Sequence, residues 1–495
     1  MPRLVAIVLA VVCGAAAWLL PHLRHRLIEA VTTYDAAPSD PAPLPAGSGP
    51  ALAPAPRVRV VLVDGLAATT AATLPAWGEA CKRGATVTMD VGFPTISLPV
   101  EVALWSGLTQ QQTGIVFRSD RPLVPPLAHG IPAQVPGSIA IAESHGYIVR
   151  SLGFADAEPA ADRADPAQDV DPLGWGNAWE DRARAAVASD ARLVFVHVLR
   201  VDSAGHRSGR DSVAYRTAAA EADAIVGELV GAAPDARWFL LSDHGHLPGG
   251  GHGGEERAVR QVQACIAGPG IAHSTGGVIS AVDMARAIAD SVGATLDRAS
   301  RGRPLSVALA APLGDLDAIP RLALGPGALA IALVALGLAA SSFGVRRWWL
   351  APWWLFAGCA LLVAIRGEPT LSTPMVYAPA GRDMYLAWLP ALALAVAATW
   401  FGLGRTTAPR VVVAQLALPV LATAGCAAAC GAWPALAGRE VAPVVPRFTA
   451  YLSPLLLLTA HGAAAVALGL LGRTVRSAFG RPSRPAPARS ARAAG

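Results

Sequence analysis

Six apolar stretches divide this chain into parts that need different surroundings, and no other feature limits its fold as strongly. The five in the last third have 18 to 22 residues each and almost no charge, which is enough to cross a bilayer core as a helix. With 53% hydrophobic residues over a length of 495, the chain is too apolar for a single soluble domain. The stretches are Leu4 to Leu20, Leu322 to Phe343, Trp348 to Ile365, Tyr385 to Gly402, Val411 to Gly431 and Tyr451 to Leu471. We therefore expect an integral membrane protein.

The N-terminal stretch follows Arg3 and is either an anchor helix or a signal peptide with a small-residue cleavage region around Gly14 to Ala17. Its length favours the anchor, and both alternatives export the chain that follows. Residues 36–56 contain seven Pro, seven Ala and no aromatic residue, which predicts an extended spacer.

The positive charge is concentrated at one end of the chain. Residues 321–495 carry 15 Arg against three acidic residues, a net charge of +12, whereas residues 1–320 carry −7. The total of +5 therefore does not indicate a nucleic-acid-binding surface. With a cytoplasmic N-terminus, Arg346, Arg347, Arg405, Arg410 and the Arg-rich C-terminus all fall on the cytoplasmic side of a bacterial-type cytoplasmic membrane. The region between the first two spans is then extracytoplasmic.

That region alternates short β-branched runs with Ala-rich helical stretches. Strands are expected at Arg57 to Val63, Leu193 to Leu199 and Trp238 to Leu241, and helices at Asn177 to Ala188, Ser212 to Val230 and Asp283 to Val292. This pattern predicts an α/β sandwich with a mostly parallel central sheet, whose functional groups gather beyond the carboxyl ends of the strands. The expected parts are an anchor or signal segment (1–30), a linker (31–56), a catalytic domain (57–319), a five-helix membrane domain (320–472) and a disordered Arg/Pro-rich tail (473–495).

Four segments of the α/β region end a strand or open a helix with a group that can bind a metal. They are VLVDG with Asp64, FPTISLP with Thr95 and Ser97, VDSAGH with Asp202 and His206, and LSDHGHLPGGGHGG with Asp243, His244 and His252. A single Asp or His at such a place is usually a turn residue. Three Asp, three His and a hydroxyl together are a suitable ligand set for two divalent ions. Pro99 suits the first turn of a helix, so the nearby hydroxyls are expected at a helix N-terminus.

In order and spacing, these segments resemble the alkaline phosphatase superfamily over about residues 57 to 305. The likeness is to the type I phosphodiesterase/nucleotide pyrophosphatase branch and to the glycosylphosphatidylinositol (GPI) ethanolamine phosphate transferases. The resemblance implies an alkaline-phosphatase-like sandwich and two metal ions, zinc in the first instance with manganese as an alternative. It implies one metal on Asp202, His206 and His252, and another on Asp64, Asp243, His244 and the nucleophile. The family pattern P-T-x-T/S-x-P maps the nucleophile to Ser97, with Thr95 as the alternative.

Some residues depart from the family pattern. Val100 and Glu101 stand where the phosphodiesterases often carry Asn-His. Arg118 occupies the approximate place of a phosphoryl-contacting Asn, either as a phosphate clamp or as a surface partner of Asp120. His246 has no counterpart in the pattern and His197 lies in a buried strand, so both are expected to be structural. The sulfatase motif C/S-x-P-x-R has no counterpart here.

The expected function is that of a membrane-anchored, extracytoplasmic, metal-dependent phosphodiesterase or phosphatase, or of a phosphoethanolamine-type phosphotransferase, acting through a phospho-Ser or phospho-Thr intermediate. Its substrate is a phosphate ester. Five helices beyond one anchor suggest a lipid-linked substrate, with membrane lipids as partners. The alternative is a membrane transport or assembly protein with a non-catalytic binding domain. The intact ligand set disfavours it, and so does the lack of Asp, Glu, Lys or Arg inside the spans. Cys81 and Cys265 remain as a candidate disulfide pair.

Overall fold

The computed structural model of this chain describes residues 3–33, 43–45, 47–115, 129–144, 146–157, 178–254, 256–314 and separate residues between 460 and 479. The first four C-terminal apolar stretches, most of the fifth and Arg118 lie outside the described residues.

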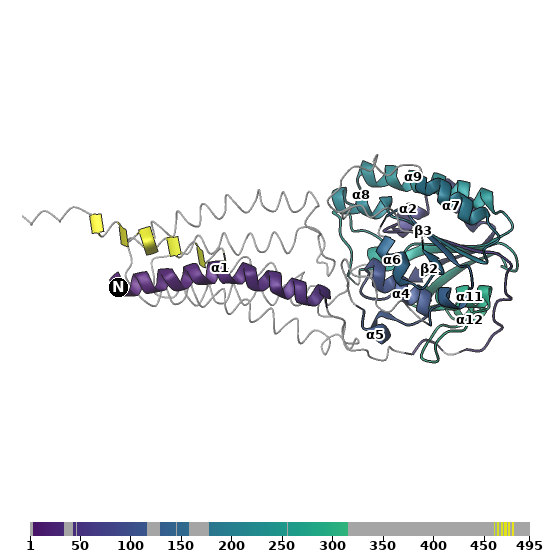
Figure 1. Ribbon diagram of the computed structural model, residues 1–495, viewed down its shortest axis with the longest axis horizontal. Helices are drawn as coiled ribbons and strands as arrows, with labels where there is room; N and C mark the ends of the chain where they lie inside the picture. Colours follow the sequence, from purple (N-terminus) through teal and green to yellow (C-terminus); the bar gives the residue numbers. More distant parts are fainter. Residues whose placement is uncertain are drawn as a thin grey trace, which may run out of the picture.

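The N-terminal apolar stretch is a helix, α1, which spans Arg3–Thr33 and continues well past the apolar run (Figure 1). Its segment Leu4–Leu23 has a mean hydropathy of 2.5 and is, within the described part of the chain, the one helix long and apolar enough to cross a membrane. Leu4, Val11 and Trp18 expose most of their surface. These features suit a membrane anchor and equally a signal segment.

The region after the linker is built on an eight-stranded sheet with the order β4-β3-β5-β1-β6-β7-β2-β8. Strand β7 is antiparallel to both of its neighbours, and all other pairs of adjacent strands are parallel. The predicted mostly parallel sheet is therefore confirmed. The strands are β1 (Val58–Val63), β2 (Gly84–Asp90), β3 (Ile139–Ala142), β4 (Asp156–Ala157), β5 (Leu193–Val198), β6 (Arg237–Leu241), β7 (Gln261–Ala267) and β8 (Ser274–Ser280).

Helices cover both faces of this sheet, which makes a three-layer sandwich (Figure 1). One face carries α4 (Ser97–Ser106), α6 (Gly146–Ser151), α11 (Ala281–Val292) and α12 (Leu305–Ala310). The other carries α3 (Pro75–Cys81), α7 (Ala178–Ala188) and α9 (Val213–Ala232). The remaining short helices are α2 (Ala68–Ala71), α5 (Gln110–Thr113), η1 (Pro132–Gln134), α8 (Arg200–Ser208) and α10 (Arg257–Arg260).

The central strands are mostly apolar because both of their faces are buried. In β1, Val58, Val60 and Leu62 pack toward the α4 layer, while Val61 and Val63 pack toward the α9 layer. The same alternation in β5 places Leu193 and Phe195 on the α4 side. This alternation also fixes the side of the sheet on which the polar residue after each strand emerges.

The last residues of the expected spacer lie against the α/β domain. The amide of Ala55 donates to the carbonyl of Ser291, and the amide of Leu52 donates to the carboxylate of Asp290. Arg237 donates to the carbonyl of Ala53. An extended Pro/Ala segment leaves its backbone groups free, and here the domain binds them. Only the part before these residues is left to act as a spacer.

Cys81 and Cys265 form a disulfide that joins the end of α3 to β7, with their Cα atoms 5.2 Å apart. The bond closes a loop across 184 residues and ties a helix of one layer to the sheet. The candidate pair in the sequence is thus a pair in the structure.

Candidate active site

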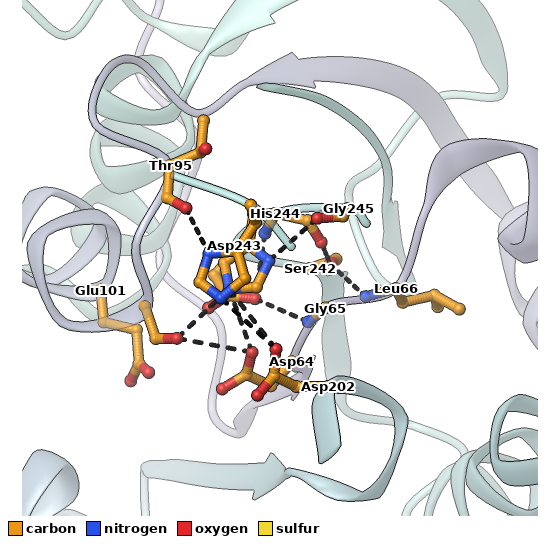
Figure 2. A network of polar contacts seen from close by, with 12 residues as sticks. Asp64, Gly65, Leu66, Thr95, Glu101, Asp202, Ser242, Asp243, His244 and Gly245 are labelled. Carbon is orange, nitrogen blue, oxygen red and sulfur yellow. Dashed lines mark hydrogen bonds and ion pairs between the residues drawn. The ribbon is translucent and has the colours of Figure 1, made fainter. Parts of the chain in front are cut away.

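Three aspartates gather at the carboxyl ends of the adjacent strands β5, β1 and β6. Asp64 directly follows β1, Asp243 lies two residues after β6, and Asp202 is the third residue of α8, which begins just after β5. All three are buried. The amide of Gly65 donates to Oδ1 of Asp243 over 3.1 Å, which joins the β1 and β6 ends directly (Figure 2). The predicted placement of the acidic residues at one sheet edge is what parallel strands produce.

Ser97 is the first residue of α4, with Pro99 inside the first turn. Its Oγ lies 3.5 Å from Oδ1 of Asp64 and 3.3 Å from Nε2 of His244. The first amides of a helix have no partner within the helix, and they lie at the positive end of its dipole. The half-buried Ser97 hydroxyl therefore lies among metal-binding groups at a place that favours negative charge.

Thr95 has a different environment. It is completely buried, and its Oγ1 donates to the carbonyl of Gly254 and accepts from the amide of Gly253. Its own carbonyl lies 2.8 Å from Nδ1 of His252 (Figure 2). The Thr95 hydroxyl thus makes hydrogen bonds with the backbone of the Gly-rich loop, residues 249–254, and holds that loop in place.

Two histidines flank Asp202. His206 is four residues further along α8, on the same face of the helix, and its Nε2 lies 3.2 Å from Oδ2 of Asp202. Nε2 of His252 lies 3.7 Å from Oδ1 of Asp202 and 3.1 Å from Nε2 of His206. These residues form the first predicted ligand group.

His244 joins the second group to the first. Its Nε2 lies 3.3 Å from Oδ1 of Asp64, 3.4 Å from Oδ2 of Asp243 and 4.0 Å from Oδ1 of Asp202 (Figure 2). Its ring stacks on that of His252 with the ring centroids 3.7 Å apart. The structure therefore brings all seven predicted metal ligands, Ser97 included, into one cluster.

The hydrogen bonds of the cluster fit divalent metal ions. Nδ1 of His244 faces the carbonyl of Gly245 and Nδ1 of His252 faces the carbonyl of Thr95, so each of these nitrogens carries the hydrogen. Both Nε2 lone pairs are then directed at carboxylates, which also can only accept. Oδ2 of Asp243 is buried without a hydrogen-bond partner. Lone pairs that face one another repel, and a bound cation would remove this repulsion by accepting them as ligands. Orientation of each imidazole by a backbone carbonyl is typical of histidine metal ligands.

The electrostatics of the cluster agree with this. Burial, followed by the charges of Asp243 and Asp202, raises the pKa of Asp64 well above its usual range. Burial likewise raises the pKa of Asp243 to about 6 and lowers the pKa of His244 to about 3. Burial also acts to raise the pKa of Asp202, but the charges and hydrogen bonds of His206 and His246 outweigh it and hold the pKa well below its usual range. Neutral imidazoles and crowded carboxylates are ready to accept a cation.

His197 and Glu101 also reach the site, which sequence reasoning missed. Nε2 of His197 lies 3.3 Å from Oδ2 of Asp64 and 3.1 Å from Oε1 of Glu101, and all three side chains are buried. His197 follows Leu193 and Phe195 in the alternation of β5, so its ring faces α4. Glu101 follows Ser97 by four residues, one helical turn along the same face. The alternation in β5 and the four-residue spacing from Ser97 to Glu101 can both be read from the sequence. They point to the site only once α4 is known to cover β5.

His246 is the third residue that was missed. It is buried, and its Nε2 lies 2.9 Å from Oδ1 of Asp202. His246 and His197 were expected to be structural residues, and the structure places each of them in contact with an aspartate of the cluster. Arg118, the predicted phosphate clamp, lies outside the described residues.

A comparison with protein families finds one domain in this chain. Residues 152–281 match the family model of type I phosphodiesterase/nucleotide pyrophosphatase. The matched range contains Asp202, His206, Asp243, His244 and His252. It begins after Asp64 and Ser97, which therefore lie outside it. No curated protein matches the chain.

Solved structures with similar folds have low sequence identity to this chain. A candidate sulfatase from Bacteroides thetaiotaomicron is 16% identical with a TM-score of 0.41, covering 53% of this chain and 76% of that one. Murine ectonucleotide pyrophosphatase/phosphodiesterase 5 is 13% identical with a TM-score of 0.37, covering 49% and 96%. A protein of the alkaline phosphatase superfamily from Vibrio parahaemolyticus is 17% identical with a TM-score of 0.36, covering 59% and 78%.

Proposed function

We propose that this chain is a metal-dependent phosphoric ester hydrolase or phosphotransferase that uses Ser97 as its nucleophile. The observation that carries the proposal is the place of the Ser97 hydroxyl, at the N-terminus of α4 and within 3.5 Å of both Asp64 and His244. The phosphodiesterase family match over residues 152–281 supports the same reaction class from independent residues.

The proposed metal ligands form two neighbouring groups. Asp202, His206 and His252 would hold one ion, and Asp64, Asp243, His244 and Ser97 would hold the other. Three imidazoles favour zinc, and the same donor set also suits manganese. When bound, two such ions supply the positive charge that stabilises phosphate oxygens during an in-line displacement.

The chain's own groups would perform the remaining steps. Ser97 Oγ attacks phosphorus, the bond to the leaving alcohol breaks, and a phospho-Ser97 intermediate forms. The free amides and dipole of the first turn of α4 favour the negative charge that develops beside Ser97. Thr95 holds the Gly-rich loop and orients His252 through its carbonyl. Water or an acceptor alcohol then releases the phosphoryl group, giving a hydrolase or a transferase.

We further propose that the α/β domain is extracytoplasmic and acts on a lipid-linked phosphate ester. The disulfide between Cys81 and Cys265 supports export, because such bonds persist in oxidising compartments. The five C-terminal apolar stretches support a lipid-linked substrate, since one helix is enough for anchoring.

The test uses the full-length protein in detergent with zinc and a chromogenic phosphodiester. We expect hydrolysis, and we expect Ser97→Ala to lower kcat by at least ~10³-fold because the covalent route is lost. Ser106→Ala, in the last turn of the same helix, is the matched control and should keep its activity. Full activity in Ser97→Ala would refute the nucleophile. Zinc binding without any turnover of phosphate esters would instead favour a binding or transport role.

A further inference from the structure

The ring of His246 lies beside Asp202, in a space that is open because Gly65 and Gly205 carry no side chain. A Cβ at Gly205 would lie 2.4 Å from Cδ2 and 2.5 Å from Nε2 of His246, and a Cβ at Gly65 would lie 3.0 Å from Cδ2. Gly205 is inside α8, where glycine costs about 1 kcal/mol relative to alanine. The close approach of the His246 ring accounts for a glycine at this unfavourable position.

The contact between His246 and Asp202 has one chemical interpretation. Nε2 of His246 lies 2.9 Å from Oδ1 of Asp202, a hydrogen-bond distance. A carboxylate can only accept, so the hydrogen must be on Nε2. A nitrogen that donates this hydrogen has no lone pair left for a metal ion. This geometry separates His246 from His244 and His252, whose Nδ1 atoms carry the hydrogen because they face carbonyls, so that their Nε2 atoms keep a lone pair for a metal ion.

Asp202 is the carboxylate that both histidine groups share. It combines with His244 and His252 in one candidate metal group and with His206 and His246 in another. Its orientation therefore affects the metal site that it is proposed to form with His206 and His252. We propose that His246 is a positioning residue, whose Nε2 hydrogen bond to Oδ1 of Asp202 fixes that carboxylate for metal binding. This inference rests on the proposed metal-dependent function and adds a residue to it.

Metal affinity is the direct readout of this role. Loss of a hydrogen bond to a ligating residue typically weakens metal binding by about 10–100-fold. The metal-free full-length protein in detergent is titrated with zinc against a chromophoric chelator. We expect two sites in the unaltered protein, and in His246→Ala one site weakened by about 10–100-fold with the other unchanged. His273→Ala removes an exposed histidine outside the site and should match the unaltered protein.

Two further variants separate positioning from ligation and from general damage. His246→Gln keeps a side-chain N–H donor and should recover most of the lost affinity. Gly205→Ala adds a methyl group against the ring and should weaken the same site. In the double variant Gly205→Ala/His246→Ala the ring is absent, so its affinity should be no lower than that of His246→Ala alone.

Equal zinc affinities in His246→Ala and the unaltered protein would overturn the inference and leave the proposed function standing. Equal weakness of His246→Gln and His246→Ala would also overturn it, because the imidazole would then be a ligand in its own right. If the unaltered protein binds no zinc or manganese, the proposed function fails and this inference fails with it.

Discussion

At the level of single residues, Ser97 and Thr95 carry similar hydroxyl groups in different surroundings. The Ser97 hydroxyl is half-buried and faces Asp64 and His244, whereas the Thr95 hydroxyl is enclosed and bonded on both sides to Gly253 and Gly254. A nucleophile has to reach the substrate, which the Thr95 hydroxyl does not do in this conformation. Thr95 should therefore matter for stability and Ser97 for the reaction.

Two substitutions at Thr95 test this division. Thr95→Ser keeps both hydrogen bonds and should retain activity close to that of the unaltered protein. Thr95→Val removes the hydrogen bonds of the Thr95 hydroxyl with the Gly253 amide and the Gly254 carbonyl, which should cost about 1–3 kcal/mol of stability. Thermal unfolding and initial rates of phosphodiester hydrolysis measure the two effects. Retained activity in Ser97→Ala together with a loss of at least ~10³-fold in Thr95→Val would assign the nucleophile to Thr95 instead.

The sequence was enough to locate the residues that directly follow a strand or open a helix. Parallel strands bring such residues together at the carboxyl ends of the strands, which the order of elements along the chain already predicts. Asp64, Asp202, Asp243 and Ser97 were found in this way. It missed His197, Glu101 and His246. Their roles depend on which helix covers which strand, as with His197 and α4, or on a close approach that glycines permit, as with His246. Neither is visible without the packed structure.

At the level of elements, the junction between β5 and α8 holds Asp202 in place, and Glu143 stabilises this junction. Oε2 of Glu143 accepts from the amides of Leu199 and Arg200 at the start of α8, and Oε1 accepts from Nε of Arg200. Glu143 is buried, and burial raises its pKa against the opposing charge of Arg200. The carboxylate therefore caps the helix that carries Asp202 and His206 and anchors it to β3.

Removing this cap should destabilise the domain. Glu143→Ala leaves the half-buried Arg200 guanidinium with one partner fewer and leaves the amides of Leu199 and Arg200 without this acceptor, so we expect a loss of about 3 kcal/mol. Glu221→Ala removes an exposed partner of the same Arg200 and should cost less than about 1 kcal/mol. The free energy of unfolding, followed by tryptophan fluorescence, compares the two variants. Similar losses in both would contradict a specific role for Glu143.

Element boundaries show where local signals were enough. Strands β1 and β6 and helices α7 and α9 lie within one or two residues of their predicted ranges. Helix α11 begins at Ala281, two residues before the predicted start at Asp283, because Ser280 and Asp283 form a capping box. The antiparallel strand β7 was not predicted at all. Its direction depends on long-range pairing with β2 and β6, which no local pattern encodes.

At the level of the whole molecule, the disulfide between Cys81 and Cys265 bears on the compartment in which the α/β domain folds. Its Cys81 end lies in the layer opposite α4, and the bond spans 184 residues of chain. A disulfide that closes a long loop typically contributes 2–5 kcal/mol, by limiting the unfolded chain in the usual account. The proposed export of the domain was inferred from its acidic sequence and from the Arg-rich C-terminal region.

Thiol labelling tests this arrangement. In membranes prepared without reductant, Cys81 and Cys265 should resist a maleimide and should react after reduction and unfolding. The double variant Cys81→Ser/Cys265→Ser should lose about 2–5 kcal/mol of stability. Full labelling of both cysteines in the unreduced, denatured protein would place the domain in a reducing compartment and contradict export.

The central claim is that phosphoryl transfer passes through Ser97, and trapping the intermediate tests it most directly. The full-length protein, loaded with zinc and turning over a phosphodiester, is quenched rapidly in acid, digested and examined by mass spectrometry. The account predicts a phosphoryl adduct on Ser97 that is absent from Thr95 and from the Ser97→Ala protein. Turnover with no adduct on Ser97, or with the adduct on Thr95, would contradict it.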